Sequence, residues 1–282
     1  MGELVLAAKV THVPSNFLSE LPGPLHGIRE PAISGLEEIG RRIRAANADT
    51  VVILDTHWLV NSGYHLNGCA HFEGLFTSNE FPHFIQDLHY CYEGNPALAD
   101  AIAETATRKG VRTRAHHIKS LDVEYGTLVP LHFMRMPSSL KIVPIAAWCA
   151  FASHEESRTV GAAIAEAIRA SESQVALVAS GSLSHRIHDN KNVERGTLTI
   201  SDEFYRQVDE RVIELWEQGR FKEFTAMLPT YAKTCFGEGW MHDTAMLMGA
   251  LGWDEYQGRV EVVTPYFESS GTGQLNAVFP LH

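Results

Sequence analysis

Three histidines occupy equivalent positions after short runs of apolar and β-branched residues that read as buried strands. They are His12 after residues 3–10, His57 after residues 50–55, and His185 after residues 174–179. A lone histidine of this kind is usually a hydrogen-bonded structural residue. In an open α/β sheet, however, the ligand crevice lies at the carboxyl ends of the strands. If these strands are parallel neighbours, the three imidazoles converge on one crevice.

A carboxylate is available to complete this set, because Glu238 lies between Gly237 and Gly239. Glycines on both sides let the backbone approach a site closely. The plain alternative is a turn with a solvated glutamate. Two histidines and one carboxylate, with open coordination positions, suit non-heme Fe(II) and oxygen chemistry. The sequence therefore contains a candidate iron site.

Other catalytic motifs are weaker. Ser182 stands in Gly-Ser-Leu-Ser-His rather than in the Gly-x-Ser-x-Gly of a hydrolase nucleophile. The run from Gly271 to Gly273 lacks the third glycine of a dinucleotide-binding fingerprint. The aromatic stretch 72–92 is expected to pack in the core or form a lid.

Composition excludes several classes of partner. The chain has 282 residues, with 23 Lys and Arg against 34 Asp and Glu, so its net charge is 23 − 34 = −11. An acidic protein is a poor candidate for binding nucleic acid or anionic lipid. There is no apolar run of the roughly 18–20 residues that span a bilayer, and no pattern of a signal peptide. We expect no nucleic-acid partner, no membrane association and a cytoplasmic location.

Helical and strand patterns alternate along the chain. Helices are expected at 31–46, 96–109, from 153 onward and at 201–218, and strands at 3–10, 50–55, 141–147, 174–179, 260–264 and 276–279. Pro144 suggests that strand 141–147 lies at a sheet edge or carries a bulge. The pattern predicts a single α/β domain over residues 1–282, with a central mixed, mostly parallel sheet flanked by helices on both faces.

Four segments carry a family resemblance: Thr11-His-Val-Pro14, Asp55-Thr-His-Trp58, Ser180-Gly-Ser-Leu-Ser-His-Arg186 and Gly237-Glu-Gly239. Together they resemble the class III extradiol ring-cleavage dioxygenases, the superfamily of the protocatechuate 4,5-dioxygenase catalytic subunit. Stretches such as LPGPLHG, DTHWLVNS, ASGSLSHR and SSGTGQLNAVFPL look more closely like bacterial members that act on 3,4-dihydroxyphenylacetate. The resemblance runs from the first strand to the C-terminus.

The resemblance implies cleavage of a catechol ring beside its two hydroxyls, with O2 as co-substrate. For 3,4-dihydroxyphenylacetate the product is 5-carboxymethyl-2-hydroxymuconate semialdehyde. By motif, Fe(II) or another divalent metal is held by His12, His57 and Glu238, with Asp243 as an alternative third ligand. His185 acts as acid and base. A homo-oligomer is expected.

One departure from the family pattern concerns a second proton-transfer histidine, which family members often have in Asp-His-Gly. This chain reads Glu124-Tyr125-Gly126 there. Tyr125 is the catalytic candidate for this role, with His116 and His117 as alternatives; a further alternative is that no residue fills the role.

The acetate side chain of the implied substrate needs a local cation or donor, because an unpaired carboxylate away from water is costly. Arg186, next to His185, is the first candidate, followed by His188 and Lys119. The alternative is that Arg186 is a surface charge. Rival functions are an extradiol enzyme for another catechol or an aminophenol, a metallohydrolase, and a non-catalytic metal-binding protein.

Overall fold

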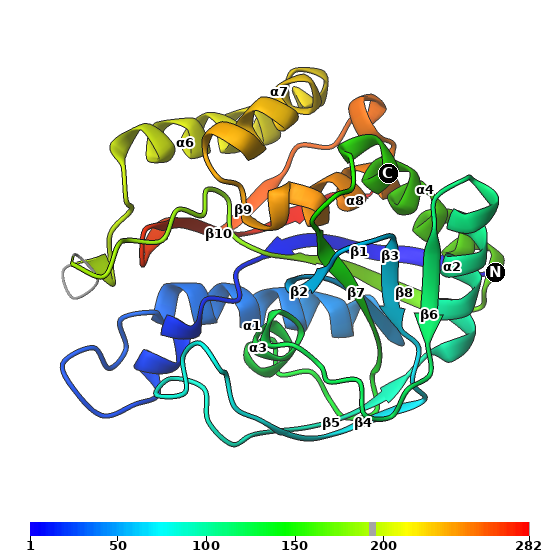
Figure 1. Cartoon of the computed structure of the whole chain (residues 1–282), viewed down its shortest axis with the longest axis horizontal. Coiled ribbons are helices and arrows are strands. Elements are labelled where there is room, and N and C mark those ends of the chain that lie inside the picture. The colour runs from blue at the N-terminus through cyan, green and yellow to red at the C-terminus, as the bar shows by residue number, and fades with distance from the viewer. Residues whose placement is uncertain (192–195, 282) are drawn as a thin grey trace.

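One large sheet with helices on both faces organises the computed structural model (Figure 1), which describes residues 1–191 and 196–281. Its strands are β1 (Glu3–Val10), β2 (Thr50–Val60), β3 (Tyr64–Asn67), β4 (His71–Phe76), β5 (Leu88–Gly94), β6 (Thr113–His116), β7 (Lys141–Cys149), β8 (Gln174–Ser180), β9 (Glu261–Ser269) and β10 (Thr272–Phe279). Its α-helices are α1 (Glu30–Ala45), α2 (Pro96–Arg108), α3 (Tyr125–Phe133), α4 (His154–Ala170), α6 (Glu203–Glu217), α7 (Phe221–Thr234) and α8 (His242–Leu251). Short 3-10 helices are η1 (Pro14–Ser19), η2 (Glu238–Met241) and η3 (Trp253–Glu255).

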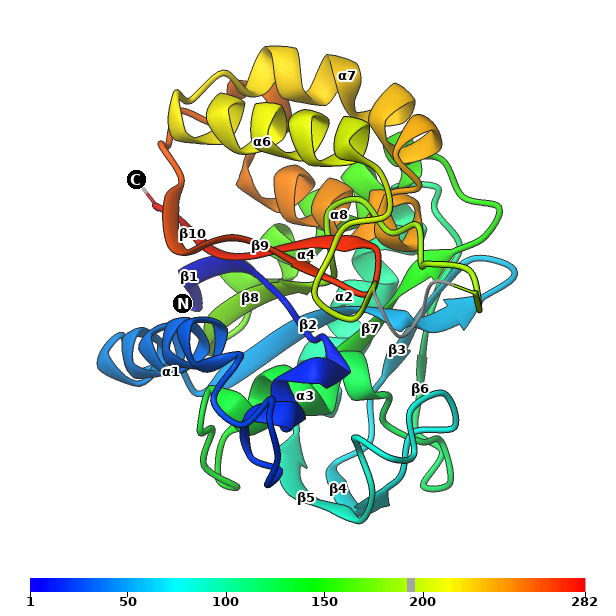
Figure 2. The ribbon, with the colours of Figure 1, turned by 90° about the vertical axis from the view of Figure 1, so that its left-hand side faces the viewer.

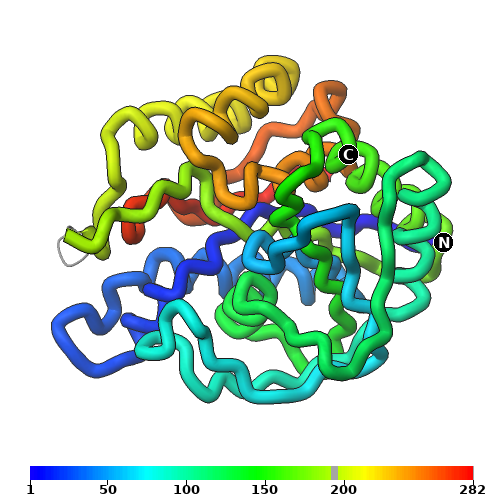
Figure 3. Tube along the Cα trace, viewed as in Figure 1, coloured from blue at the N-terminus to red at the C-terminus, as the bar shows by residue number. Residues whose placement is uncertain are grey.

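The strand order is β4-β5-β7-β2-β8-β1-β10-β9, with β3 and β6 attached to β7. Strands β5, β7, β2, β8 and β1 run parallel, whereas β10 pairs with β1 in the antiparallel sense. Figure 3 shows that the first and last strands lie side by side although they come from opposite ends of the chain. The α/β class and the mixed, mostly parallel sheet are confirmed.

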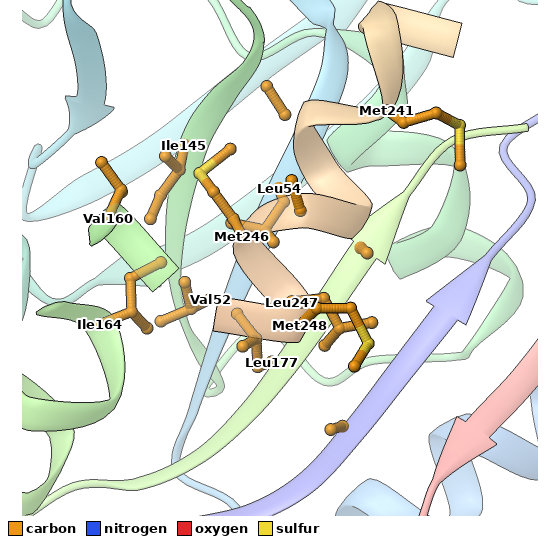
Figure 4. Packing of buried hydrophobic residues seen from close by; sticks show 14 of the residues in the cluster. Val52, Leu54, Ile145, Val160, Ile164, Leu177, Met241, Met246, Leu247 and Met248 are labelled. Carbon is orange, nitrogen blue, oxygen red and sulfur yellow. The ribbon is translucent and has the colours of Figure 1, made fainter. Parts of the chain in front are cut away.

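The helices cover both faces of the sheet, with α6, α7 and α8 on one side and α1 and α3 on the other (Figure 2). Along β2, alternate residues enter the two cores. Val52 and Leu54 pack under α8 and α4, where Met246 and Ile164 contact the sheet (Figure 4). A parallel strand covered on both faces is apolar throughout, which explains the uninterrupted run TVVIL.

The helix starts follow local capping chemistry. Asn95 caps α2 by accepting a hydrogen bond from the backbone N–H of Leu98, and Ser153 with Glu156 forms a capping box at α4. No helix of the described residues is long and apolar enough to cross a membrane.

Two expectations about strands need correction. Strand β2 continues to Val60 instead of ending at residue 55, so His57 lies within it. Strand β7 is internal, yet β5 pairs only with its residues Lys141 and Ile142, and β3 pairs with it at Ile145. Pro144 is tolerated because neither β5 nor β3 pairs with this residue.

Candidate metal centre and active-site pocket

The pairing among three adjacent parallel strands, β1, β8 and β2, ends at the same level of the sheet. In the register of the central strands, Ser180 of β8 pairs with Val10 of β1 on one side and with Asp55 of β2 on the other. The residues that follow these positions therefore emerge together at one edge. His12 follows the end of β1, and His57 lies within β2 just beyond this level.

The side chains of His12, His57 and Glu238 meet at this edge. One potential ligand atom from each lies within 4.8 Å of those of the other two. The Nε2 atom of His12 is 3.0 Å from Oε1 of Glu238, and the Nε2 atom of His57 is 3.5 Å from the same oxygen. His12 and Glu238 are almost fully buried, and the side chain of His57 is 11% exposed.

A strand irregularity brings His57 to this cluster. The pairing of β2 with β7 shifts register between Asp55 and Leu59, and such irregularities re-aim side chains beside active sites. The buried carboxylate of Asp55 accepts the backbone N–H of His57 at 2.8 Å and the hydroxyl of Thr127 at 2.7 Å. Burial, and then the neighbouring His12, lowers the pKa of His57 to about 3. Its imidazole is therefore neutral and able to bind a metal ion.

Glu238 reaches the cluster from a tight turn between α7 and α8. The next three residues, Gly239, Trp240 and Met241, all have a φ between +53° and +61°. Only glycine adopts this region without strain, so the turn stores strain beside the site. The Glu238 carboxylate accepts the backbone N–H of Ser182, and the hydroxyl of Thr56 lies 2.9 Å from it.

Electrostatics keeps this buried carboxylate charged. Burial alone would raise the pKa of Glu238, but His12 and His185 lower it well below its usual value. Burial alone would likewise lower the pKa of His12, yet the adjacent Glu238 raises it. The cluster is thus a buried anion compensated by imidazoles.

Hydrogen counting shows that the cluster suits a cation. Ser180 donates its hydroxyl to the carbonyl of Gly126, so its oxygen accepts from Nδ1–H of His12 at 2.9 Å. The lone pair on Nε2 of His12 then points at the Glu238 carboxylate. Two facing acceptors need a proton or a metal ion between them. With His57 beside them, these donors fit a divalent metal.

Asp243, the alternative third ligand, lies elsewhere. Its Oδ2 atom is 2.6 Å from Nζ of Lys9, and neither side chain is exposed. The carboxylate of Asp243 is therefore paired with Lys9 and is not part of the cluster of His12, His57 and Glu238.

A pocket opens over the cluster. Its walls are formed by residues from several elements: His12, His57, Tyr125, Ser182, His185, Glu80, Phe81, Phe84, Ser15, Ser269 and Ser270. Phe81 and Phe84 belong to the stretch 72–92 that was expected to form core or lid.

His185 stands beside the cluster and outside the three-residue set. Its Nε2 atom lies 3.9 Å from Oε1 of Glu238.

Tyr125, the candidate for the second proton-transfer role, lies beside His57. Its hydroxyl is 2.5 Å from Nε2 of His57 and 3.2 Å from a carboxylate oxygen of Glu80. Burial raises the pKa of Tyr125 far above its usual value, so the phenol stays protonated. Of the alternatives, His116 bonds to His65 and His117 bonds to Asp100, and neither lines the pocket.

The structure does not bring the expected carboxylate anchors to the pocket. Arg186 is exposed, and its guanidinium lies 5.0 Å from the ring centroid of Phe236. His188 bonds to Thr199, and Lys119 is exposed on the surface. None of these three residues is part of the pocket wall.

Sequence reasoning missed several groups around the site. Ser180 and Thr56 lie within the recognised motifs, and their positions near the histidines were a usable signal for supporting hydrogen bonds. Glu80 and Ser15 gave no comparable signal, because their roles depend on loops that approach only in the folded chain.

Comparisons with known proteins agree with this geometry. Residues 6–280 match the family model described as the catalytic LigB subunit of aromatic ring-opening dioxygenase. The chain is 52% identical over 270 residues to an Escherichia coli 3,4-dihydroxyphenylacetate 2,3-dioxygenase, covering 96% of this chain and 98% of that protein. It is 26% identical over 268 residues to the beta subunit of a Pseudomonas 2-aminophenol 1,6-dioxygenase, covering 86% and 85%.

A solved structure supports the fold alone. The crystal structure of an uncharacterized Escherichia coli K12 protein superimposes with a TM-score of 0.63 at 16% identity, covering 98% of this chain and 100% of that one. The family match, in contrast, spans nearly the whole sequence and includes every strand end that builds the cluster. The chain therefore belongs to the family of the catalytic LigB subunit of aromatic ring-opening dioxygenases.

Proposed function

We propose that this enzyme cleaves the ring of 3,4-dihydroxyphenylacetate with O2, beside the two hydroxyls, to give 5-carboxymethyl-2-hydroxymuconate semialdehyde. The identity of 52% to the Escherichia coli 3,4-dihydroxyphenylacetate 2,3-dioxygenase supports this substrate. The observation that carries the chemistry is the convergence of His12, His57 and Glu238 beneath a pocket that also holds His185.

The three clustered residues are proposed to hold Fe(II). A neutral imidazole, a second imidazole fixed by Ser180 and a buried carboxylate form a donor set that suits this ion. When bound, the ion supplies open positions for the catechol oxygens and O2, and lets electron density pass from one to the other.

His185 is proposed to move the protons. It lines the pocket, and its side chain is 24% exposed, so a substrate hydroxyl reaches it. It takes a proton from a catechol hydroxyl and returns it as the ring opens, because an imidazole accepts and donates protons near neutral pH. Tyr125 is proposed as the second donor beside His57, and Phe81 and Phe84 exclude water from the pocket.

An oxygen electrode tests the proposal. The protein is reconstituted with Fe(II) in the absence of air and then mixed with 3,4-dihydroxyphenylacetate in oxygenated buffer. Oxygen uptake with a yellow product is expected, and 2-aminophenol run in parallel tests the aminophenol alternative. Hydrolysis of esters with Zn²⁺ and no oxygen uptake would instead indicate a metallohydrolase. That the protein forms a homo-oligomer remains a prediction. Light scattering tests it by measuring the molar mass in solution.

A further inference from the structure

A buried arginine lies directly behind the pocket wall. Arg29 is 6% exposed at the start of α1. Its Nε donates to Oγ of Ser15 at 3.0 Å, its Nη2 donates to the carbonyl of Thr197 at 3.4 Å, and its guanidinium lies 5.0 Å from the ring centroid of Phe267. Burial lowers its pKa to about 10, which leaves it positively charged at neutral pH.

No carboxylate of the described residues forms an ion pair with Arg29. This is unusual, because a charge taken out of water is costly unless an opposite charge compensates it. The two oxygens and the ring around Arg29 provide only partial compensation. Among residues 1–191 and 196–281, the Arg29 guanidinium therefore has no paired carboxylate, and an anion close by would compensate its charge.

The pocket is where such an anion fits. Ser15, which accepts from Arg29, lines the pocket, and so does Ser269, whose Oγ is 2.9 Å from Oγ of Ser15. The residues that line the pocket within the described chain include no lysine or arginine, while Glu80 adds a negative charge. Arg29 is thus the cation connected to the pocket wall through this serine pair.

Hydrogen counting gives the serine pair a direction. Arginine donates and never accepts, so Ser15 accepts from it. The two serines hold two hydroxyl hydrogens, and the bond between them uses one. Whichever serine donates in that bond, the other hydroxyl hydrogen remains available, and both serines line the pocket. The pair therefore offers a donor to the pocket, backed by a positive charge.

We propose that Arg29 is a positioning residue that selects catechols with a carboxylate side chain, which the Ser15–Ser269 pair binds. This rests on the proposed function and assigns the substrate carboxylate to a place in the pocket. Arg29 is too deeply buried to contact the substrate itself. Its charge acts by polarising the serine hydroxyls that make the contact. Arg186 then has no part in recognition.

The test compares an acidic substrate with a neutral one of similar size. We expect Arg29→Gln to lower kcat/KM for 3,4-dihydroxyphenylacetate by about 10–100-fold, the range of a charge-assisted hydrogen bond. The loss should fall mainly on KM, because the carboxylate is remote from the bonds that break. For 4-methylcatechol, which lacks the carboxylate, the change should stay within about threefold. Arg29→Lys keeps the charge and should recover part of the selectivity.

Matched controls separate recognition from folding and from net charge. Arg41→Gln removes a charge from the exposed face of the same helix and should leave the ratio of the two substrates unchanged. If Arg29→Gln does not fold, the double variant Ser15→Ala/Ser269→Ala carries the test, because it removes both hydroxyls of the pair and leaves Arg29 in place. This variant should show the same selective loss for the acid.

Equal losses on both substrates in Arg29→Gln and in the Ser15→Ala/Ser269→Ala double variant would overturn the inference, as would a selective loss in Arg186→Gln. A wild-type enzyme with no preference for the acid over 4-methylcatechol would overturn it too. Failure of the proposed function looks different, because the wild type would then consume no oxygen with either catechol. In that case anaerobic equilibrium dialysis of both catechols against wild type and Arg29→Gln still decides the inference.

Discussion

Two acids only five residues apart should respond in opposite ways to neutralisation. Glu238 faces two imidazoles at the proposed metal site, while Asp243 is bound to Lys9 inside the protein. Glu238→Gln should therefore lose metal and keep its fold, since a glutamine oxygen still accepts the N–H of Ser182. Asp243→Asn should keep its metal and lose stability.

The magnitudes follow from the two environments. Removing one partner of a buried ion pair costs about 3–5 kcal/mol, and no solvent screens the Lys9–Asp243 pair because both side chains are fully buried. At roughly 2.1 cal/mol/K of unfolding entropy per residue, this corresponds to a Tm lower by about 5–8 °C for a chain of this length. Losing a residue that only hydrogen-bonds to a metal ligand weakens metal binding by about 10–100-fold. Glu238→Gln removes a proposed ligand, so its loss of metal affinity should exceed the upper end of that range.

The assay combines metal analysis with thermal unfolding. Metal content is measured by atomic emission after anaerobic loading, and Tm is measured on chelator-treated protein so that bound metal does not mask the difference. Adding Lys9→Met to Asp243→Asn should restore most of the stability, because it removes the unpaired buried charge. Full metal occupancy in Glu238→Gln, with loss in Asp243→Asn, would refute the reasoning and make Asp243 the third ligand.

Three further variants test the pocket. His185→Gln should retain its metal but lose about 100-fold or more in kcat, because it removes the acid and base; loss of metal would instead make His185 a ligand. Tyr125→Phe should also retain its metal and lower kcat by about 100-fold in a stopped-flow assay, whereas a near-normal rate would show that the departure from Asp-His-Gly has no functional effect. Gly126→Ala places a methyl carbon 2.1 Å from Oδ1 of Asp55, and denaturant unfolding should show a loss of about 1–3 kcal/mol; unchanged stability would contradict this packing.

Local sequence determines much of the frame of this protein. The apolar runs of β1, β2 and β8 are dictated by burial on both faces, and the caps of α2 and α4 by hydrogen bonds within four residues. The histidines that follow apolar runs and the glycine-flanked Glu238 were visible for the same reason, since each signal depends on immediate neighbours in the sequence. Strands β3 to β6 were missed because they are short or partly exposed and lack a clear period.

Tertiary structure decides which of these residues meet. Only the strand order, with β8 between β1 and β2, brings His12 next to His57. The left-handed turn at residues 239–241 separates the directions of Glu238 and Asp243, which spacing alone left as equal candidates. Arg186 stands next to His185 in sequence but outside the pocket, whereas the distant Arg29 lies behind its wall. Distance along the chain does not fix distance in space once a sheet has assembled, because neighbouring strands place residues from remote segments side by side.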